Sequence, residues 1–196
     1  MDILSNMITD FYIRKKYVPE EKREIYCYGF KLILSDIINF SIIILLGIIF
    51  GKLFESIIFL VTLCSVRQFS GGFHAKTFWM CRMAMMITFL CVITVAYLLL
   101  KVVCYNIWFI SILDMLSVVL IAILAPVKYS NKLLSEQQRK KNKMKAIIAS
   151  FILSVISIIL IAAGRAEGVT ISITLAAVVI LMIIGIAVKK GGDSNV

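Results

Sequence analysis

Long apolar runs separated by short polar stretches dominate this 196-residue chain. Five of the runs have 18 to 20 residues, close to the roughly 20 residues that a membrane-spanning helix needs, and a sixth is shorter. The runs are Leu32–Phe50, Leu53–Val66, Met83–Leu100, Asn106–Ala125, Ala146–Ala163 and Val169–Val188. This pattern predicts an all-α polytopic membrane protein with six transmembrane helices.

The second run, Leu53–Val66, is short enough to be a re-entrant segment instead of a span. The distribution of basic residues favours a span. With six spans, the segments on the side of the N-terminus hold 18 of the 21 Lys and Arg residues, whereas five spans would move the basic segments 67–82 and 126–145 to the other side. Basic residues mark the cytoplasmic side of a membrane protein, so we expect both termini, including the tail 189–196, to be cytoplasmic.

The N-terminal segment 1–30 is too polar to span a membrane, but its apolar residues recur every three or four positions. This spacing predicts an amphipathic helix, either at the membrane interface or packed on the rest of the protein. We expect an N-terminal amphipathic interfacial helix, followed by a six-helix transmembrane domain over residues 31–188. The residues that form the apolar stripe are Ile3, Leu4, Met7, Ile8, Phe11 and Tyr12.

Composition agrees with a membrane protein, because 61% of the residues are hydrophobic and the mean hydropathy is +1.00. The net charge of +10 is therefore interpreted as an orientation signal, and no nucleic-acid partner is expected. The five cysteines include no CxxC pair and the chain has one histidine, a pattern that predicts no disulfide framework, no metal site and no cofactor.

The segment 67–82 contains that single histidine, His74, and the only cysteine in a polar loop, Cys81. A thiol attacks as its thiolate, and a neighbouring imidazole can take the proton or stand as its cationic partner. Arg67 and Arg82 would add positive potential. On spacing alone, a structural histidine beside an incidental thiol remains the alternative.

Geometry limits how this pair could work. In one straight helix a seven-residue offset separates His74 and Cys81 by about 10.5 Å along the axis, whereas a hydrogen bond needs about 3 Å. Glycine adopts backbone conformations closed to other residues. We therefore predict that the chain folds back at Gly71-Gly72 and brings His74 towards Cys81.

Other polar residues are also candidates for a functional role. Asp36 and Asp114 lie within predicted spans, where they could orient the histidine, pair with basic residues or mark a solute path. The loop 126–145 carries seven cations, which suit an orientation signal attracted to anionic lipid. The alternative for this loop is a docking surface for an acidic peptide tail that uses Lys140, Lys141 and Lys143.

One set of residues resembles the AgrB family, accessory gene regulator B, over essentially the whole chain. The set is Arg67, Ser70-Gly71-Gly72, His74-Ala75 and Cys81, followed by Ala125-Pro126 and Asn131-Lys132. The resemblance implies a membrane cysteine endopeptidase of Gram-positive quorum sensing that processes an AgrD-like propeptide to a cyclic autoinducing peptide. It implies a multi-pass protein of the cell membrane with its active site on the cytoplasmic side, membrane lipids around it and a homodimer as the expected oligomer.

The resemblance also implies roles for individual residues. Cys81 would be the nucleophile and His74 the general base or ion-pair partner. Arg67 and Gly72 match positions needed for the site, and Gly71 and Ala75 complete the motif. Two alternatives remain open from the sequence, namely a membrane peptide transporter or exporter and a non-catalytic membrane scaffold.

Overall fold

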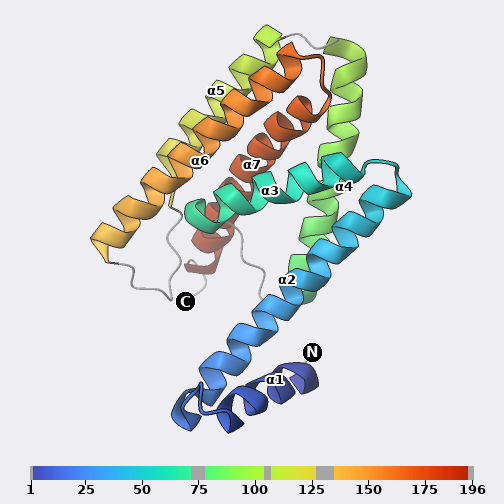
Figure 1. The fold of residues 1–196 in the computed structure, drawn as a ribbon. Helices are drawn as coiled ribbons and strands as arrows, with labels where there is room; N and C mark the ends of the chain where they lie inside the picture. Colours follow the sequence, from blue (N-terminus) through green and yellow to red (C-terminus); the bar gives the residue numbers. More distant parts are fainter. Residues whose placement is uncertain (1, 72–77, 104–106, 127–134, 194–196) are drawn as a thin grey trace.

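The computed structural model describes residues 2–71, 78–103, 107–126 and 135–193. In these ranges the chain is helical and contains no strand, which confirms the all-α prediction. Seven α-helices and one short 3-10 helix follow one another along the chain (Figure 1). They are α1 (Asp2–Arg14), η1 (Glu20–Lys22), α2 (Arg23–Ile49), α3 (Leu53–Ser70), α4 (Phe78–Val103), α5 (Ile107–Leu124), α6 (Glu136–Ala162) and α7 (Glu167–Asp193).

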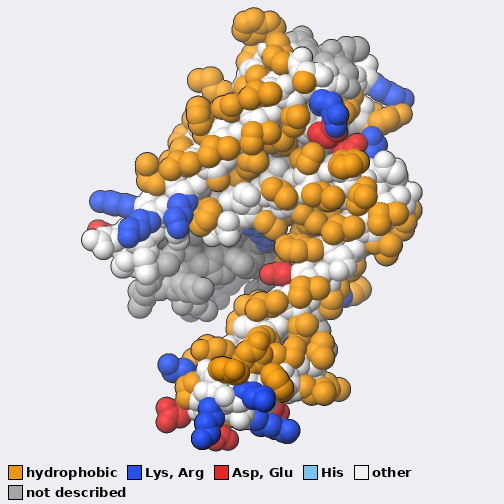
Figure 2. All heavy atoms as spheres, viewed as in Figure 1, with side chains coloured by type: hydrophobic (Ala, Val, Ile, Leu, Met, Phe, Trp, Pro, Cys, Tyr) orange, Lys and Arg blue, Asp and Glu red, His pale blue; other side chains and the backbone are white. Residues whose placement is uncertain are grey.

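Six of these helices, α2 to α7, are long and apolar enough to cross a membrane. The predicted number of spans is therefore confirmed, including the short second run, which becomes the 18-residue helix α3. Apolar side chains cover most of the visible surface of the bundle (Figure 2). Such an exterior is expected where the surroundings are lipid.

Helix α7 is the centre of the bundle and contacts α3, α4, α5 and α6. Its inward residues Leu175, Val178 and Met182 are almost completely buried. Small hydroxyl residues on the same helix, Thr170 and Ser172, are also buried. A helix enclosed on several sides must be apolar or small around its circumference, and α7 has this composition.

Helix α1 packs on the first half of α2, and this pair, which we call the arm, stands apart from the other helices (Figure 1). Two ion pairs join the helices, Asp2 with Lys31 and Asp10 with Arg23. The hydrogen bond and charge of Lys31 hold the pKa of Asp2 below its ordinary value. The predicted N-terminal helix is thus confirmed, and it packs on another part of the protein.

The two ends of the bundle differ. We call the end at which α3 ends and α4 begins the motif end, and the opposite end the far end. At the motif end α2, α4 and α6 begin earlier than their apolar runs, at Arg23, Phe78 and Glu136. An apolar run identifies only the part of a helix that can lie in the hydrocarbon core, and the same helix can continue beyond it with polar residues.

Candidate functional site

Helix α3 places the first residues of segment 67–82 at the motif end and ends before Gly71. The N–H of Gly71 donates to the carbonyl of Arg67 over 3.1 Å, which closes the last turn. Gly71 has φ 73° and ψ −160°, a combination that is essentially restricted to glycine. Helix α3 therefore ends at the first glycine of the pair, and the predicted fold-back of the chain stays a prediction. Gly72, His74 and Ala75 lie outside the described residues.

Cys81 lies in α4, three residues after Phe78, the first residue of the helix as described. Its thiol is free and its side chain is half-buried, so it is partly accessible at the motif end. Because His74 is outside the described ranges, the predicted approach of His74 to Cys81 stays a prediction. The described residues show that α3 and α4 are separate helices on either side of the segment that holds the histidine.

Arg82, next to Cys81, is held by two other side chains. Its Nε donates to the Oδ1 of Asn39 in α2 over 3.3 Å, and its guanidinium carbon lies 5.7 Å from the centroid of the Trp79 ring. Asn39 is only 3% exposed and Arg82 is half-buried, so the accepting side of this hydrogen bond is buried. The link ties the start of α4 to the middle of α2. Sequence reasoning did not single out Asn39, although an amide inside an apolar run was the available signal.

Helix α3 contributes further polar side chains close to those of α2. Both Asp36 of α2 and Arg67 of α3 interact electrostatically with the Cys64 side chain. Asp36 is exposed, whereas Arg67 and Cys64 are half-buried. Residues of α2, α3 and α4 therefore converge at the motif end, and Asp36 lies one helical turn before Asn39.

The basic start of α6 also belongs to the motif end. Ser135 and Gln138 form a capping box that begins the helix. The side chains of Lys140, Lys141 and Lys143 are exposed. One turn further on, the Nζ of Lys145 lies 5.3 Å from the centroid of the Phe69 ring near the end of α3. This contact brings the cation-rich turns of α6 beside the end of the helix that carries Arg67 and Gly71.

Comparison with known proteins decides the family. The family model described as accessory gene regulator B matches residues 5–188, nearly the whole chain. The chain belongs to this AgrB family. Family membership supports involvement in the accessory gene regulator system of quorum sensing and, with the six long apolar helices, makes the chain a multi-pass membrane protein.

Two relatives of the family illustrate the similarity. Protein FsrB of Enterococcus faecalis (strain ATCC 47077 / OG1RF) is 35% identical over 65 residues, which cover 33% of this chain and 27% of FsrB. Putative AgrB-like protein 2 of Clostridium perfringens (strain 13 / Type A) is 27% identical over 89 residues, which cover 45% of this chain and 42% of that protein. The matched part thus spans less than half the length of each relative. No solved structure matches the chain significantly.

A second polar group in this AgrB-family chain lies towards the far end. Asp114 of α5 is fully buried, and its carboxylate oxygens make no hydrogen bond to any described residue. The Ser157 and Ser172 hydroxyls are near, but they are 2.7 Å from each other, and Ser157 donates to the carbonyl of Gly168 over 3.0 Å. This group lies in the half of the bundle opposite Cys81 and shares no residue with the motif.

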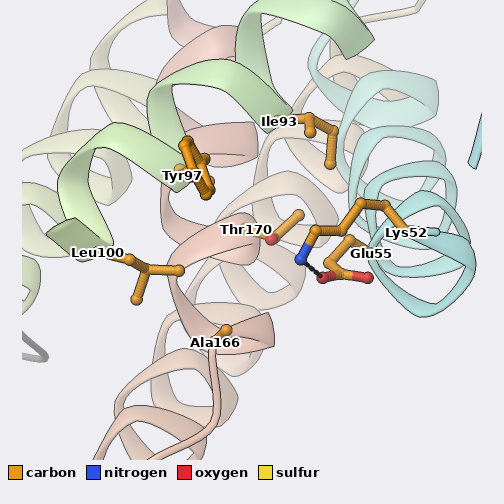
Figure 3. Close-up of a pocket in the computed structure, with 8 residues that line it drawn as sticks. Lys52, Glu55, Ile93, Tyr97, Leu100, Ala166 and Thr170 are labelled. Carbon is orange, nitrogen blue, oxygen red and sulfur yellow. Dashed lines mark hydrogen bonds and ion pairs between the residues drawn. The ribbon is translucent and has the colours of Figure 1, made fainter. Parts of the chain in front are cut away.

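A pocket at the far end is equally separate from the motif. It lies between the starts of α3 and α7 and the end of α4 (Figure 3). Its polar part is the ion pair of Lys52 and Glu55, with Nζ and Oε1 2.8 Å apart, and Tyr97 and Leu100 supply an apolar side. None of the predicted site residues lines it. Within the described ranges, no group of three or more His, Cys, Asp and Glu residues could hold a metal ion.

Proposed function

We propose that this AgrB-family protein is a membrane cysteine endopeptidase that removes the C-terminal tail of an AgrD-like propeptide and enables cyclisation to an autoinducing peptide. The observation that carries the proposal is the family match over residues 5–188, which includes the whole of segment 67–82. The free, half-buried thiol of Cys81 at the motif end supports it, because a nucleophile must be reachable by substrate.

In the proposed reaction, His74 takes the thiol proton and the Cys81 sulfur attacks the carbonyl carbon between the future ring and the tail. A carbon–sulfur bond forms, the carbon–nitrogen bond breaks, and the imidazolium gives its proton to the departing tail amine. A substrate thiol or hydroxyl then attacks the thioester. Its proton passes through His74 to the sulfur, so the ring closes and the enzyme is restored without consuming water.

The supporting residues have distinct parts in this proposal. The end of α3 at Gly71 lies between Arg67 on α3 and Cys81 on α4, and His74 lies between the same two residues in the sequence. Gly72 and Ala75 belong to the same segment. The guanidinium of Arg67 supplies positive charge at the motif end, where a thiolate and a developing oxyanion need it.

Docking of the substrate tail is the second part of the proposal. Lys140, Lys141 and Lys143 are exposed, and the contact of Lys145 with Phe69 supports their nearness to the motif. An acidic tail that binds these cations would lead the scissile bond towards Cys81. The cationic surface would act mainly on substrate binding and little on the chemical step.

The proposal includes an orientation and partners. Because 18 of the 21 Lys and Arg residues fall on the side of the N-terminus, we infer that both termini and the motif end are cytoplasmic, where a propeptide is made. Membrane lipids surround the protein, and the active form is a homodimer.

The test uses the purified full chain in lipid nanodiscs with a synthetic AgrD-like propeptide. Cys81→Ala should abolish tail release and the thioester-linked mass on the protein, and His74→Ala should lower the rate by about 100- to 10,000-fold. Cys91→Ala is the matched control, because Cys91 is a free, exposed cysteine on the same helix. Tail release that persists in Cys81→Ala would end the proposal.

A further inference from the structure

The arm formed by α1 and the first half of α2 buries small polar side chains between its helices and exposes several large apolar ones. Ser5 and Thr9 of α1 are fully buried, and Cys27 of α2 lies 3.2 Å from the Oδ1 of Asn6. On the outer side, Ile3 is 78% exposed and Met7 is 63% exposed. A water-soluble helix pair has the opposite arrangement, because apolar area normally leaves water.

Helix α2 also exposes apolar side chains. Ile25, Tyr28 and Ile33 are strongly exposed in the half of α2 that α1 covers on one side only. Exposed apolar residues continue into the span, for example at Ile37, with the exposed Asp36 beside them. The outer surface of the arm is therefore an extension of the surface that faces lipid.

Tyrosines and charges show how deep the arm should lie. Four of the seven tyrosines are exposed on it, and tyrosine is enriched where membrane meets water. Charges of both signs gather at its tip, around the turn between α1 and α2 (Figure 2). The four tyrosines are Tyr12, Tyr17, Tyr26 and Tyr28.

The length of α2 gives the same estimate for the depth of the arm in the membrane. Lys31, which pairs with Asp2, lies 18 residues before Ile49, or about 27 Å along the helix, and the hydrocarbon core is about 30 Å thick. The start of α1 is thus at the edge of the core. From there α1 runs out through the headgroup layer to the charged turn.

We propose that the arm is embedded in the leaflet at the motif end, with Ile3 and Leu4 of α1 against the carbonyl ends of the lipid acyl chains and Met7 and Phe11 in the headgroup layer. The polar contacts between α1 and α2 then act as an interhelical seam shielded from water, and the charged turn stays in water. This differs from a helix lying alone on the surface, because α2 holds α1 at a defined depth. The inference does not depend on peptide processing.

The experiment measures depth in the full chain with a single tryptophan. Trp79→Phe and Trp108→Phe remove the native tryptophans, and Met7→Trp places the reporter on the exposed face of α1, with Leu4→Trp as a second reporter site. Glu21→Trp in the exposed charged turn is the control. Lipids brominated near the carbonyl end of the chains report contact with acyl chains, and iodide reports contact with water.

The expected result is that brominated lipid lowers the emission of Leu4→Trp by at least about half, that of Met7→Trp less and that of Glu21→Trp least, with the opposite order for iodide. The effect should be the same in nanodiscs with one copy and with two copies. Iodide quenching of the Met7→Trp and Leu4→Trp variants without lipid quenching would overturn the proposal in favour of a water-exposed face. Lipid quenching seen only with one copy per disc would overturn it in favour of a second chain covering the face.

Discussion

The motif end and the far end of this bundle differ in how closely their helices pack and in the side chains that they carry. At the far end, two turns are short, and Gly47 and Gly168 let neighbouring helices approach so closely that an added Cβ would collide with Ser56 or with Ser157 and Ile161. At the motif end, α2, α4 and α6 continue beyond their apolar runs. Close helix packing thus characterises the far end, whereas the motif end carries the Cys81 thiol and the exposed cations of α6.

Because the two ends differ, two glycines with positive φ should differ in their importance for activity. Gly71 at the motif end and Gly51 at the far end both have positive φ, 73° and 65°. At Gly51 the conformation serves only to turn the chain between α2 and α3. At Gly71 it also sets the path of the segment that leads to Cys81.

The largest expected effect comes from Gly71→Ala compared with Gly51→Ala. An added Cβ strains both backbones, by about 1–3 kcal/mol at such positions. Gly71→Ala should also shift the reactive segment, and a displacement of about 1 Å can cost about 100-fold in rate. We expect at least that loss of tail release for Gly71→Ala and less than about twofold for Gly51→Ala.

The measurement is the initial rate of tail release in proteoliposomes, normalised to folded protein and paired with a thermal unfolding curve. The two variants should lose similar stability. Equal losses of activity would show that the motif end has no special sensitivity, and the distinction between the two ends would fail.

Sequence predicted the features that depend on hydropathy and covalent spacing. The six spans, the end of α3 at Gly71 and the N-terminal helix follow from local pattern, because lipid selects apolar residues and glycine tolerates unusual φ. Asn39 could not be found in this way, since its role depends on α2 and α4 meeting 43 residues apart in sequence. The inverted polarity of the arm was also hidden, because periodicity predicts two faces but not which face is covered.

Charge at the motif end gives the second prediction. Replacing Lys140, Lys141 and Lys143 together by Gln should raise KM for the propeptide by about tenfold or more at low salt, since each basic residue near such a surface contributes about 1 kcal/mol. Screening should shrink the difference at high salt, while kcat changes little.

Arg165→Gln is the control for the other end of the bundle, where Arg165 pairs with Glu167 over 2.6 Å. It should leave KM unchanged at every salt concentration. If the triple replacement behaves like Arg165→Gln, the tail does not bind to α6. Orientation in the discs should be verified for each variant, because basic residues also guide insertion.

Asn39 and Arg82 provide the third, smaller effect. Asn39→Leu leaves the Nε of Arg82 without its buried acceptor and should lower the free energy of unfolding by about 1–3 kcal/mol. Processing should fall several-fold, because the start of α4 loses its tie to α2. Combining Asn39→Leu with Arg82→Gln should cost less than the sum of the single changes by about 1 kcal/mol, as measured by unfolding in a double-mutant cycle. Strict additivity would mean that the 3.3 Å contact contributes nothing.

The smallest effect on processing is expected at Asp114, towards the far end. Its carboxylate is buried without a hydrogen bond to a described residue, so Asp114→Leu removes a polar group whose burial is unfavourable. Ser157 and Ser172 keep their mutual hydrogen bond and the Gly168 carbonyl as partner. The free energy of unfolding should stay the same or rise by about 1 kcal/mol, and tail release should stay within about twofold. Asp114→Asn, which retains a polar side chain of the same shape, is the control. If both variants fold normally yet lose processing or peptide movement across the membrane, the carboxylate is functional, and the transport alternative gains its first direct support.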